Sequence, residues 1–355
     1  MFEFFEGLIE KLGLKLISDF SNKLYDWIEE AIKNSDAENN DNGKNRAQIG
    51  SSGDYAKIGS SGDSAQIGSS GDSAKIGSSG DYAKIGSSGD SAKIGSSGDS
   101  AQIGSSGDYA KIEISGDYAK IGSSGDSAKI GSSGDYAKIE ISGDSSIGFV
   151  CGFNSIIKAK KGTWISLAEY GKNKEGKIIP IYAKSAQVGN KEYKDHSGKM
   201  LKANTYYVLW KKEFYEVDNY DGIWTIRITE KKRENITIIK SMPLNNILDE
   251  NPREIYIAKE GKLSAHAYSV REAVEDLTFK KMKDINVDEI VAKIKETGKV
   301  TRSQYRAITG ACSFGTNQFC EKHNIQDLEE IELTELRKIL IDDYGAKKFW
   351  NLIGE

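Results

Sequence analysis

The chain has 355 residues, a formal net charge of −4 and three cysteines, Cys151, Cys312 and Cys320. Its length allows two or three domains, and its weakly acidic balance excludes the strong basic excess that is typical of nucleic-acid-binding proteins. An odd number of widely spaced cysteines favours reduced thiols in a cytoplasmic compartment, no apolar run is long enough to span a membrane, and the N-terminus lacks the basic start of a secretory signal.

Residues 1–34 carry apolar side chains at three- and four-residue steps, with Trp27 among them. This spacing predicts an amphipathic helix or helical hairpin. Ten acidic residues oppose five lysines in residues 1–45, so an anionic bilayer would repel the segment. We therefore expect it to form a homo-oligomer or to cap the array that follows, with Trp27 as a candidate contact. Residues 35–45 read as a polar linker.

A nonapeptide repeat fills most of residues 46–158, with the consensus Ser-Gly-Asp-(Tyr/Ser)-Ala-(Lys/Gln)-Ile-Gly-Ser. A short fixed period is typical of solenoids, and two nonapeptides back to back make one coil of about 18 residues. The period-two pattern places Ala, Ile and Ser inward and Tyr, Lys and Gly outward, and Glu113 and Glu140 keep the outward parity. We expect the Gly to form the turn by adopting strained dihedral angles, and the Asp by bonding its own backbone.

The repeat tyrosines are a candidate interaction surface. Four of them are 27 residues apart, which is one and a half coils, so they should alternate between the two faces of the solenoid and form no single aromatic ladder. The full set is Tyr55, Tyr82, Tyr109, Tyr118 and Tyr136.

Residues 159–254 predict a small antiparallel β domain that caps the exposed strand edges of the solenoid. The expected strands cover residues 162–170, 178–183, 205–210, 214–217, 224–229 and 236–239.

Residues 255–355 predict an α-helical domain. A helix capped by Ser269 should run to Lys283, and further helices should cover residues 287–296, 302–309, 316–322, 334–341 and 349–353. The expected fold class is therefore mainly β: a parallel β-solenoid with an N-terminal amphipathic helix, a small antiparallel β cap domain and a C-terminal α-helical domain.

Four segments carry a resemblance to a known group of proteins. They are the Ser-Gly-Asp-Tyr-Ala arrays with the Ala-Lys-Lys-Gly-Thr-Trp run that begins at Ala159, the Lys-Ala-Asn-Thr-Tyr-Tyr run of residues 202–207, the run of residues 270–280, and the Tyr-Arg-Ala-Ile-Thr-Gly-Ala-Cys run that begins at Tyr305. Together they resemble nonapeptide-repeat proteins encoded by bacteriophages and mobile elements. The resemblance implies a phage origin, but its motifs are structural and bring no active site with them.

The sequence offers little for a metal site. Calcium-binding β-rolls need Gly-Gly-x-Gly-x-Asp, whereas here the Asp directly follows a lone Gly, which favours a turn and a solvated ladder of charges. Cys312, Cys320 and His323 supply three zinc ligands without a fourth at a usual spacing, and both cysteines are better explained as small buried residues. We therefore expect neither a metal nor a cofactor.

Catalysis and nucleic-acid binding also find weak support. His266 has acidic residues downstream but no Ser or Cys nucleophile beside it in the sequence, so it reads as a histidine at a helix start. Residues 302–324 read as helix, turn, helix, with Arg302 and Arg306 as candidate contacts, yet residues 280–355 have no net charge to neutralise phosphates. Nucleic acid is therefore an unfavoured partner.

The favoured hypothesis is a non-enzymatic protein-binding protein of the host-cell cytoplasm, in which a rigid solenoid spaces terminal binding modules. Its partner would be a host protein or protein complex, with inhibition of a host defence complex as the role that the phage resemblance favours. Two alternatives remain: a structural virion component or adhesin, and a DNA-binding regulator that uses the C-terminal helices.

Overall fold

A computed structural model describes residues 44–249, 252–281, 286–326, 328 and 330–354, in two compact units that divide between Val217 and Asp218. The helix predicted for residues 1–34, with Trp27, and nearly all of the predicted linker lie outside the described residues. In the part of the chain that the structure describes, no helix is long and apolar enough to cross a membrane.

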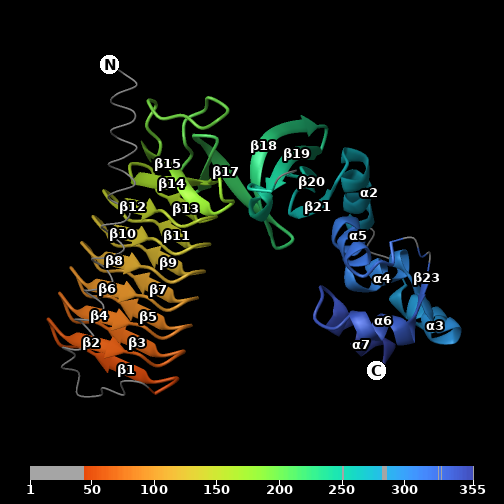
Figure 1. Cartoon of the computed structure of the whole chain (residues 1–355), viewed down its shortest axis with the longest axis horizontal. Helices are drawn as coiled ribbons and strands as arrows, with labels where there is room; N and C mark the ends of the chain where they lie inside the picture. Colours follow the sequence, from red (N-terminus) through yellow and green to blue (C-terminus); the bar gives the residue numbers. More distant parts are fainter. Residues whose placement is uncertain (1–43, 250–251, 282–285, 327, 329, 355) are drawn as a thin grey trace. The chain divides into compact units, whose positions relative to one another are not determined.

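The first unit contains a parallel β-solenoid of about 18 residues per coil, as predicted (Figure 1). Odd-numbered strands pair in one sheet and even-numbered strands in the other, so that Ile49 lies beside Ile67 and Ile58 beside Ile76. The strands are β1 Gln48–Ser51, β2 Lys57–Ser60, β3 Gln66–Ser69, β4 Lys75–Ser78, β5 Lys84–Ser87, β6 Lys93–Ser96, β7 Gln102–Ser105, β8 Lys111–Ile114, β9 Lys120–Ser123, β10 Lys129–Ser132, β11 Lys138–Ile141, β12 Ile147–Val150 and β13 Ile156–Ala159.

The predicted inward parity of Ile and Ser and the outward parity of Tyr and Lys are confirmed, although the glycines of β2, β4, β6 and β10, which were expected to face outward, are buried. Ile58 and Ser60 are fully buried, whereas Tyr55 is 76% exposed. At two repeats the inward Ser is replaced by Ile, and Ile114 is fully buried beside Ser96 of the neighbouring coil. Because inward side chains of both sheets meet in one narrow core, each coil is stabilised by its neighbours rather than by itself.

The turns are built differently from the prediction. The left-handed residue is the one after Asp, for example Tyr82 at φ 58° and Ser91 at φ 57°, and the Gly of the triplet keeps a negative or extended φ. That Gly is needed because coils stack closely: a Cβ built on Gly107 would lie 2.0 Å from the carbonyl oxygen of Gly89. The glycine is therefore required by the close packing of the coils, and not by a backbone conformation that other residues avoid.

The Asp side chains bond the next coil rather than their own backbone, which also corrects the prediction. Asp99 Oδ1 accepts a hydrogen bond from the backbone N–H of Asp117 at 2.8 Å, and the same bond repeats along the array. At the first turn Asn45 takes the place of Asp and accepts from the N–H of Asp63 at 3.0 Å. Each turn therefore adds one side-chain hydrogen bond to the backbone hydrogen bonds that join neighbouring coils.

Asp99→Ala should lower the stability of the solenoid by about 1 kcal/mol, because the N–H of Asp117 loses its acceptor. Asp99→Asn should change it by less than about half of that, since the Asn carboxamide oxygen can accept the same bond, as Asn45 does. Urea denaturation followed by circular dichroism measures both variants. If Asp99→Ala and Asp99→Asn lost the same free energy of unfolding, the charge of Asp99, and not its hydrogen bond, would stabilise the turn.

The tyrosines alternate between the two faces as predicted, but a short aromatic ladder also forms. Tyr118 and Tyr136, which are one coil apart, stack with ring centroids 4.9 Å apart. Phe153 and Tyr170 extend the row through edge-to-face contacts at 5.8 and 5.7 Å. The tyrosines therefore form no single ladder along the array, but a short one forms at this end, where aromatic residues recur in successive coils.

The strands predicted after the array are present. β14 Trp164–Lys172 continues the even-numbered sheet in parallel with β12, and β15 Ile178–Gln187 pairs with it antiparallel. β16 Tyr206–Trp210 pairs antiparallel with β13 of the other sheet, and β17 Glu213–Tyr220 pairs with β16. Both sheets of the solenoid therefore continue into antiparallel strands.

The second unit begins with an antiparallel sheet and ends in helices, as predicted for its C-terminal part (Figure 1). Ser269 caps α2 as predicted, because its Oγ accepts the N–H of Glu272 at 3.2 Å. The strands β21, β22 and β23 were not predicted. The elements are β18 Ile223–Arg233, β19 Ile236–Pro243, η1 Leu244–Asn246, β20 Ile255–Glu260, β21 Leu263–Ala267, α2 Val270–Lys281, α3 Val287–Thr297, β22 Lys299–Thr301, α4 Arg302–Thr309, α5 Ser313–Lys322, β23 Glu330–Glu332, α6 Leu333–Ile339 and α7 Ala346–Ile353.

Candidate functional site

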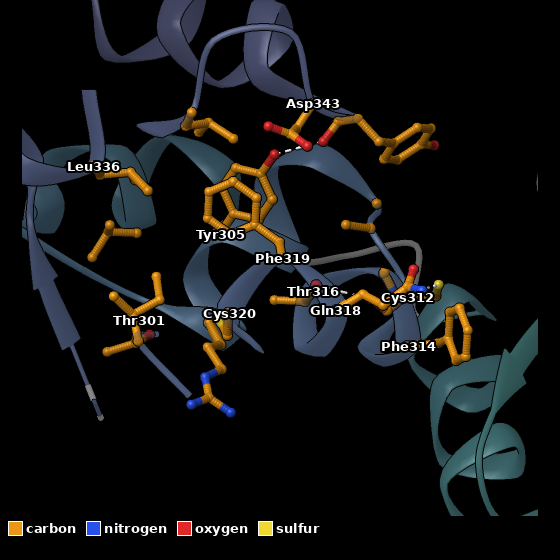
Figure 2. Close-up of a pocket in the computed structure, with 18 of the residues that line it drawn as sticks. Thr301, Tyr305, Cys312, Phe314, Thr316, Gln318, Phe319, Cys320, Leu336 and Asp343 are labelled. Atoms are coloured by element: carbon orange, nitrogen blue, oxygen red, sulfur yellow. Dashed lines mark hydrogen bonds between the residues drawn. The ribbon is translucent and has the colours of Figure 1, made fainter. Parts of the chain in front are cut away.

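A pocket of about 220 Å³ lies within the second unit. Helices α4, α5 and α6 line it together with β22, β23, the end of β21 and the turn before β18. In Figure 2, Cys312 and Phe314 lie at one side of the pocket and Leu336 at the other, with Tyr305 and Phe319 between them. The lining is mainly apolar, so the polar groups at its edges determine which ligand it fits.

Cys312 stands at the start of α5, where it is the N-cap residue with extended dihedral angles. Its Sγ accepts a hydrogen bond from the N–H of Gly315 at 3.4 Å, in place of the hydroxyl or carboxylate oxygen that usually caps a helix. The residue is 9% exposed. The sulfur therefore lies at the positive end of the helix dipole.

His266, on β21, is 2% exposed and lies between Cys312 and Asp221. Cys312 Sγ is 3.1 Å from Nε2 and 3.7 Å from Nδ1 of the imidazole, so the sulfur faces the edge of the ring that joins the two nitrogens. Asp221 Oδ2 is 3.4 Å from Nδ1, and Lys280 Nζ is 2.6 Å from the same oxygen. Asp221 takes the left-handed position of the turn after β17, at φ 52°. A thiol, an imidazole and a carboxylate thus meet at the pocket.

Charge stabilises this cluster. Burial alone would lower the pKa of His266, but its contacts with Asp221 and Cys312 outweigh burial and raise the pKa to about 9. Burial would raise the pKa of Asp221, yet His266 and Lys280 lower it overall. The imidazole is therefore held as a cation beside the sulfur at neutral pH.

The stability that His266 contributes should decline with rising pH. Its folded pKa of about 9 exceeds the unfolded value of about 6.5, so the contribution is complete below pH 6.5 and is lost as pH rises through 9. We therefore expect the melting temperature of the wild-type protein to exceed that of His266→Asn most at pH 6 and least at pH 9.5. The charged or titratable groups that face His266 are Asp221, Cys312 and, through Asp221, Lys280. A difference that stays constant or grows with pH would contradict this assignment.

A buried ion pair fixes the start of α5. Asp276 of α2 is 4% exposed, pairs with Arg306 of α4, and accepts hydrogen bonds from the Oγ and, at 2.9 Å, the N–H of Ser313. Arg306 Nε also donates to the carbonyl oxygen of Ala311 at 3.2 Å. Since Ala311 and Ser313 flank Cys312, these bonds hold the sulfur in place.

The cluster is also the place where a metal would have to bind. Among the described residues, Asp221, His266 and Cys312 bring their donor atoms within 4.8 Å of one another, and the structure adds no fourth ligand to them. Structural zinc sites use four ligands. In addition, the ammonium of Lys280 already neutralises Asp221 Oδ2. The donor set therefore fits a hydrogen-bonded ionic cluster better than a structural zinc ion.

The residues singled out from the sequence fall in different places. Arg302 lines the pocket and donates to the carbonyl oxygens of Gln326 and, at 3.4 Å, Leu328. Arg306 is committed to the ion pair with Asp276. Cys312 meets His266 and Asp221, and the described residues do not group it with Cys320 and His323. The five repeat tyrosines remain 39% to 76% exposed along the solenoid.

Sequence reasoning missed the pairing of His266 with Cys312. It set His266 aside because no nucleophile stood near it in the sequence, whereas the fold brings the thiol from 46 residues downstream. The available signal was Cys312 shortly before the helix predicted for residues 316–322, since helix starts are where reactive thiols occur. Comparison with known proteins adds nothing to this assignment: no family model, no curated protein and no solved structure matches the chain.

Proposed function

We propose that the chain is a protein-binding protein in which the solenoid is a rigid spacer and the non-repetitive C-terminal unit carries the specificity. The observation that supports this most directly is the contrast between the two units. The array offers only Lys or Gln at the same outward position in coil after coil, as in Gln66, Lys84 and Gln102, while the pocket of the second unit has a non-repetitive lining.

The charge of the array supports a spacer rather than a binding face. Its outward Lys and Gln side chains are solvated, and its Asp side chains bond the next coil. A partner that shifted along this surface by one coil would meet a similar row of Lys, Gln, Ser and Tyr side chains, so the array defines a binding register only weakly. A unique site must therefore come from non-repetitive residues.

The proposed partner is a host protein or complex, and the proposed role is inhibition of a host defence complex. The resemblance of the repeat and of the segment around Tyr305 to phage-encoded proteins supports this role. The antiparallel strands β15 and β16 would serve as the cap of the solenoid, and the segment before residue 44 would provide oligomerisation.

The test uses the full-length protein and a substitution that fills the pocket. Gln318 lines the pocket and is exposed, so Gln318→Trp should block it at little cost in stability. Lys347→Trp, at an exposed position of α7 outside the pocket, is the matched control. Tagged wild-type protein and Lys347→Trp should recover one host complex in stoichiometric amount after expression in host cells, and Gln318→Trp should not.

Two outcomes would contradict the proposal. One is that no host protein is recovered in stoichiometric amount, and the other is that Gln318→Trp recovers the same complex as the wild type. A deletion of residues 91–108 then tests the spacer. It removes one coil and keeps the order of the sheets, so binding by a single end should survive it.

A further inference from the structure

We propose that Cys312 is a nucleophilic thiol, that His266 is its proton-transfer partner, that Asp221 orients His266, and that the pocket takes an acyl compound whose carbonyl group reacts with Cys312. This inference goes beyond the binding role and does not depend on it. It rests on the start of α5, strand β21 and the turn after β17, which bring the thiol of Cys312, the imidazole of His266 and the carboxylate of Asp221 to one pocket.

The position of the sulfur is the first argument. Cys312 caps a helix of ten residues, and the N–H of Gly315 is directed at its Sγ. A helix start lowers the energy of a thiolate. The protein contains a natural comparison in Cys320, which lines the same pocket from within α5 but lies away from the helix start and outside the cluster.

The imidazole is the second argument. His266 is almost completely buried, and a buried imidazole that carries a proton needs anionic partners. The Asp221 carboxylate lies 3.4 Å from Nδ1, and the Cys312 sulfur lies 3.1 Å from Nε2. The ring also packs edge to face on Phe314, with centroids 4.8 Å apart. A thiol beside a base that a third group orients is the arrangement of covalent acyl-transfer sites.

The pocket is the third argument, because it determines the class of substrate. The sulfur shares this pocket with an apolar lining that begins at Phe314 beside Cys312 and extends to Leu336 on the other side (Figure 2). The apolar residues are Phe314, Phe319, Ile331, Leu336 and Leu340. The pocket is too small for a folded partner and suits an apolar acyl group or one apolar side chain of a peptide. An ester, thioester or amide with an apolar acyl group would place its carbonyl carbon at Cys312.

The reaction is a hydrolysis without a redox step. The Cys312 thiolate attacks the carbonyl carbon, the bond to the leaving group breaks, and the leaving group takes its proton from His266. A thioester then joins the acyl group to Sγ. Water attacks this thioester, His266 accepts the proton from the water, and the carboxylic acid departs as the thiolate is restored. Nε2 is the ring nitrogen nearer to the sulfur, at 3.1 Å against 3.7 Å for Nδ1, so we assign these transfers to Nε2.

The test measures thiol reactivity and acyl transfer in the purified full-length protein. Iodoacetamide at pH 7 should alkylate Cys312 at least ten times faster than Cys320 and Cys151, as peptide mapping by mass spectrometry would show. p-Nitrophenyl butyrate should give a burst of one equivalent of nitrophenol and a butyryl thioester on Cys312. Cys151→Ser, in the solenoid, should leave both results unchanged.

Two variants separate activation from exposure. His266→Asn should lower the alkylation rate of Cys312 at least tenfold and abolish the burst. Asp221→Asn, which suits the left-handed turn position, should retain the fold and lower the burst rate at least threefold. If His266→Asn unfolds the protein, Cys320 will be alkylated faster than in the wild type. In that case the burst rate of Asp221→Asn tests the proposal.

Three results would overturn the proposal. The first is alkylation of Cys312 no faster than that of Cys320. The second is a burst that Asp221→Asn leaves unchanged. The third is one equivalent of zinc in the purified protein, with Cys312 reactive only after chelation, because the cluster would then be a metal site.

Discussion

Gly107→Ala will destabilise the solenoid by about 3 kcal/mol, a large effect for the addition of one methyl group. A Cβ at this position would lie 2.0 Å from the carbonyl oxygen and 2.5 Å from the carbonyl carbon of Gly89 in the preceding coil. Both are backbone atoms that the parallel pairing of β5 and β7 holds in place, so no side chain can move aside. The coils must separate locally, and the hydrogen bonds on either side of the turn are then stretched.

Gly104→Ala, three residues away, is the matched control. Gly104 faces outward on β7, and a Cβ built there meets no atom within 4 Å. The array itself tolerates larger side chains at this parity, since Glu113 and Glu140 occupy equivalent positions in β8 and β11. We expect Gly104→Ala to be neutral or to stabilise by up to about 1 kcal/mol, because alanine restricts the unfolded chain.

Thermal unfolding by circular dichroism and hydrogen exchange by mass spectrometry measure the pair. Gly107→Ala should lose amide protection first in the coils that contain Gly89 and Gly107, because stability in a solenoid is a sum over neighbouring coils. Equal melting temperatures for the two variants would contradict this prediction. They would mean that the close approach of Gly107 to Gly89 does not limit the size of the side chain at this position.

The parity of the solenoid could be predicted because it depends on one coil alone. The outward positions of Lys84 and Glu113 follow from the cost of burying a charge, and these two residues show the rule in both sheets. The role of the triplet could not be predicted, because it depends on the spacing between coils. Gly107 and Asp99 act on residues 18 positions away, and no local turn rule describes such contacts.

The helices of the second unit were predictable for a similar reason. α4 begins and ends at the predicted residues because Thr301 and Gln304 form a capping box and Gly310 takes the left-handed position at its end. The site was not predictable, because β21 is short and had no clear alternation. Because that strand was not predicted, the sequence could not place His266 close to Cys312, and it indicated only a turn at Asp221.

Asp276→Ala will destabilise the second unit by about 3 to 5 kcal/mol, the range expected when one partner of a buried ion pair is removed. The substitution leaves the guanidinium of Arg306 without its carboxylate and the N–H and hydroxyl of Ser313 without their acceptor. These bonds join α2 to α4 and to the first turn of α5. Urea denaturation gives the loss in stability, and hydrogen exchange should show that residues 302–322 open first.

Glu335→Ala is the control that separates a buried pair from an exposed one. Glu335 pairs with Lys338 at 2.6 Å on α6, but both side chains are more than half exposed, so its removal should cost less than about 0.5 kcal/mol. Asp276→Asn should fall between the two alanine variants, because the carboxamide can still accept from Ser313 while the charge opposite Arg306 is lost. Losses of the same size for Asp276→Ala and Glu335→Ala would show that water reaches Asp276, and that the start of α5 is held by apolar packing instead.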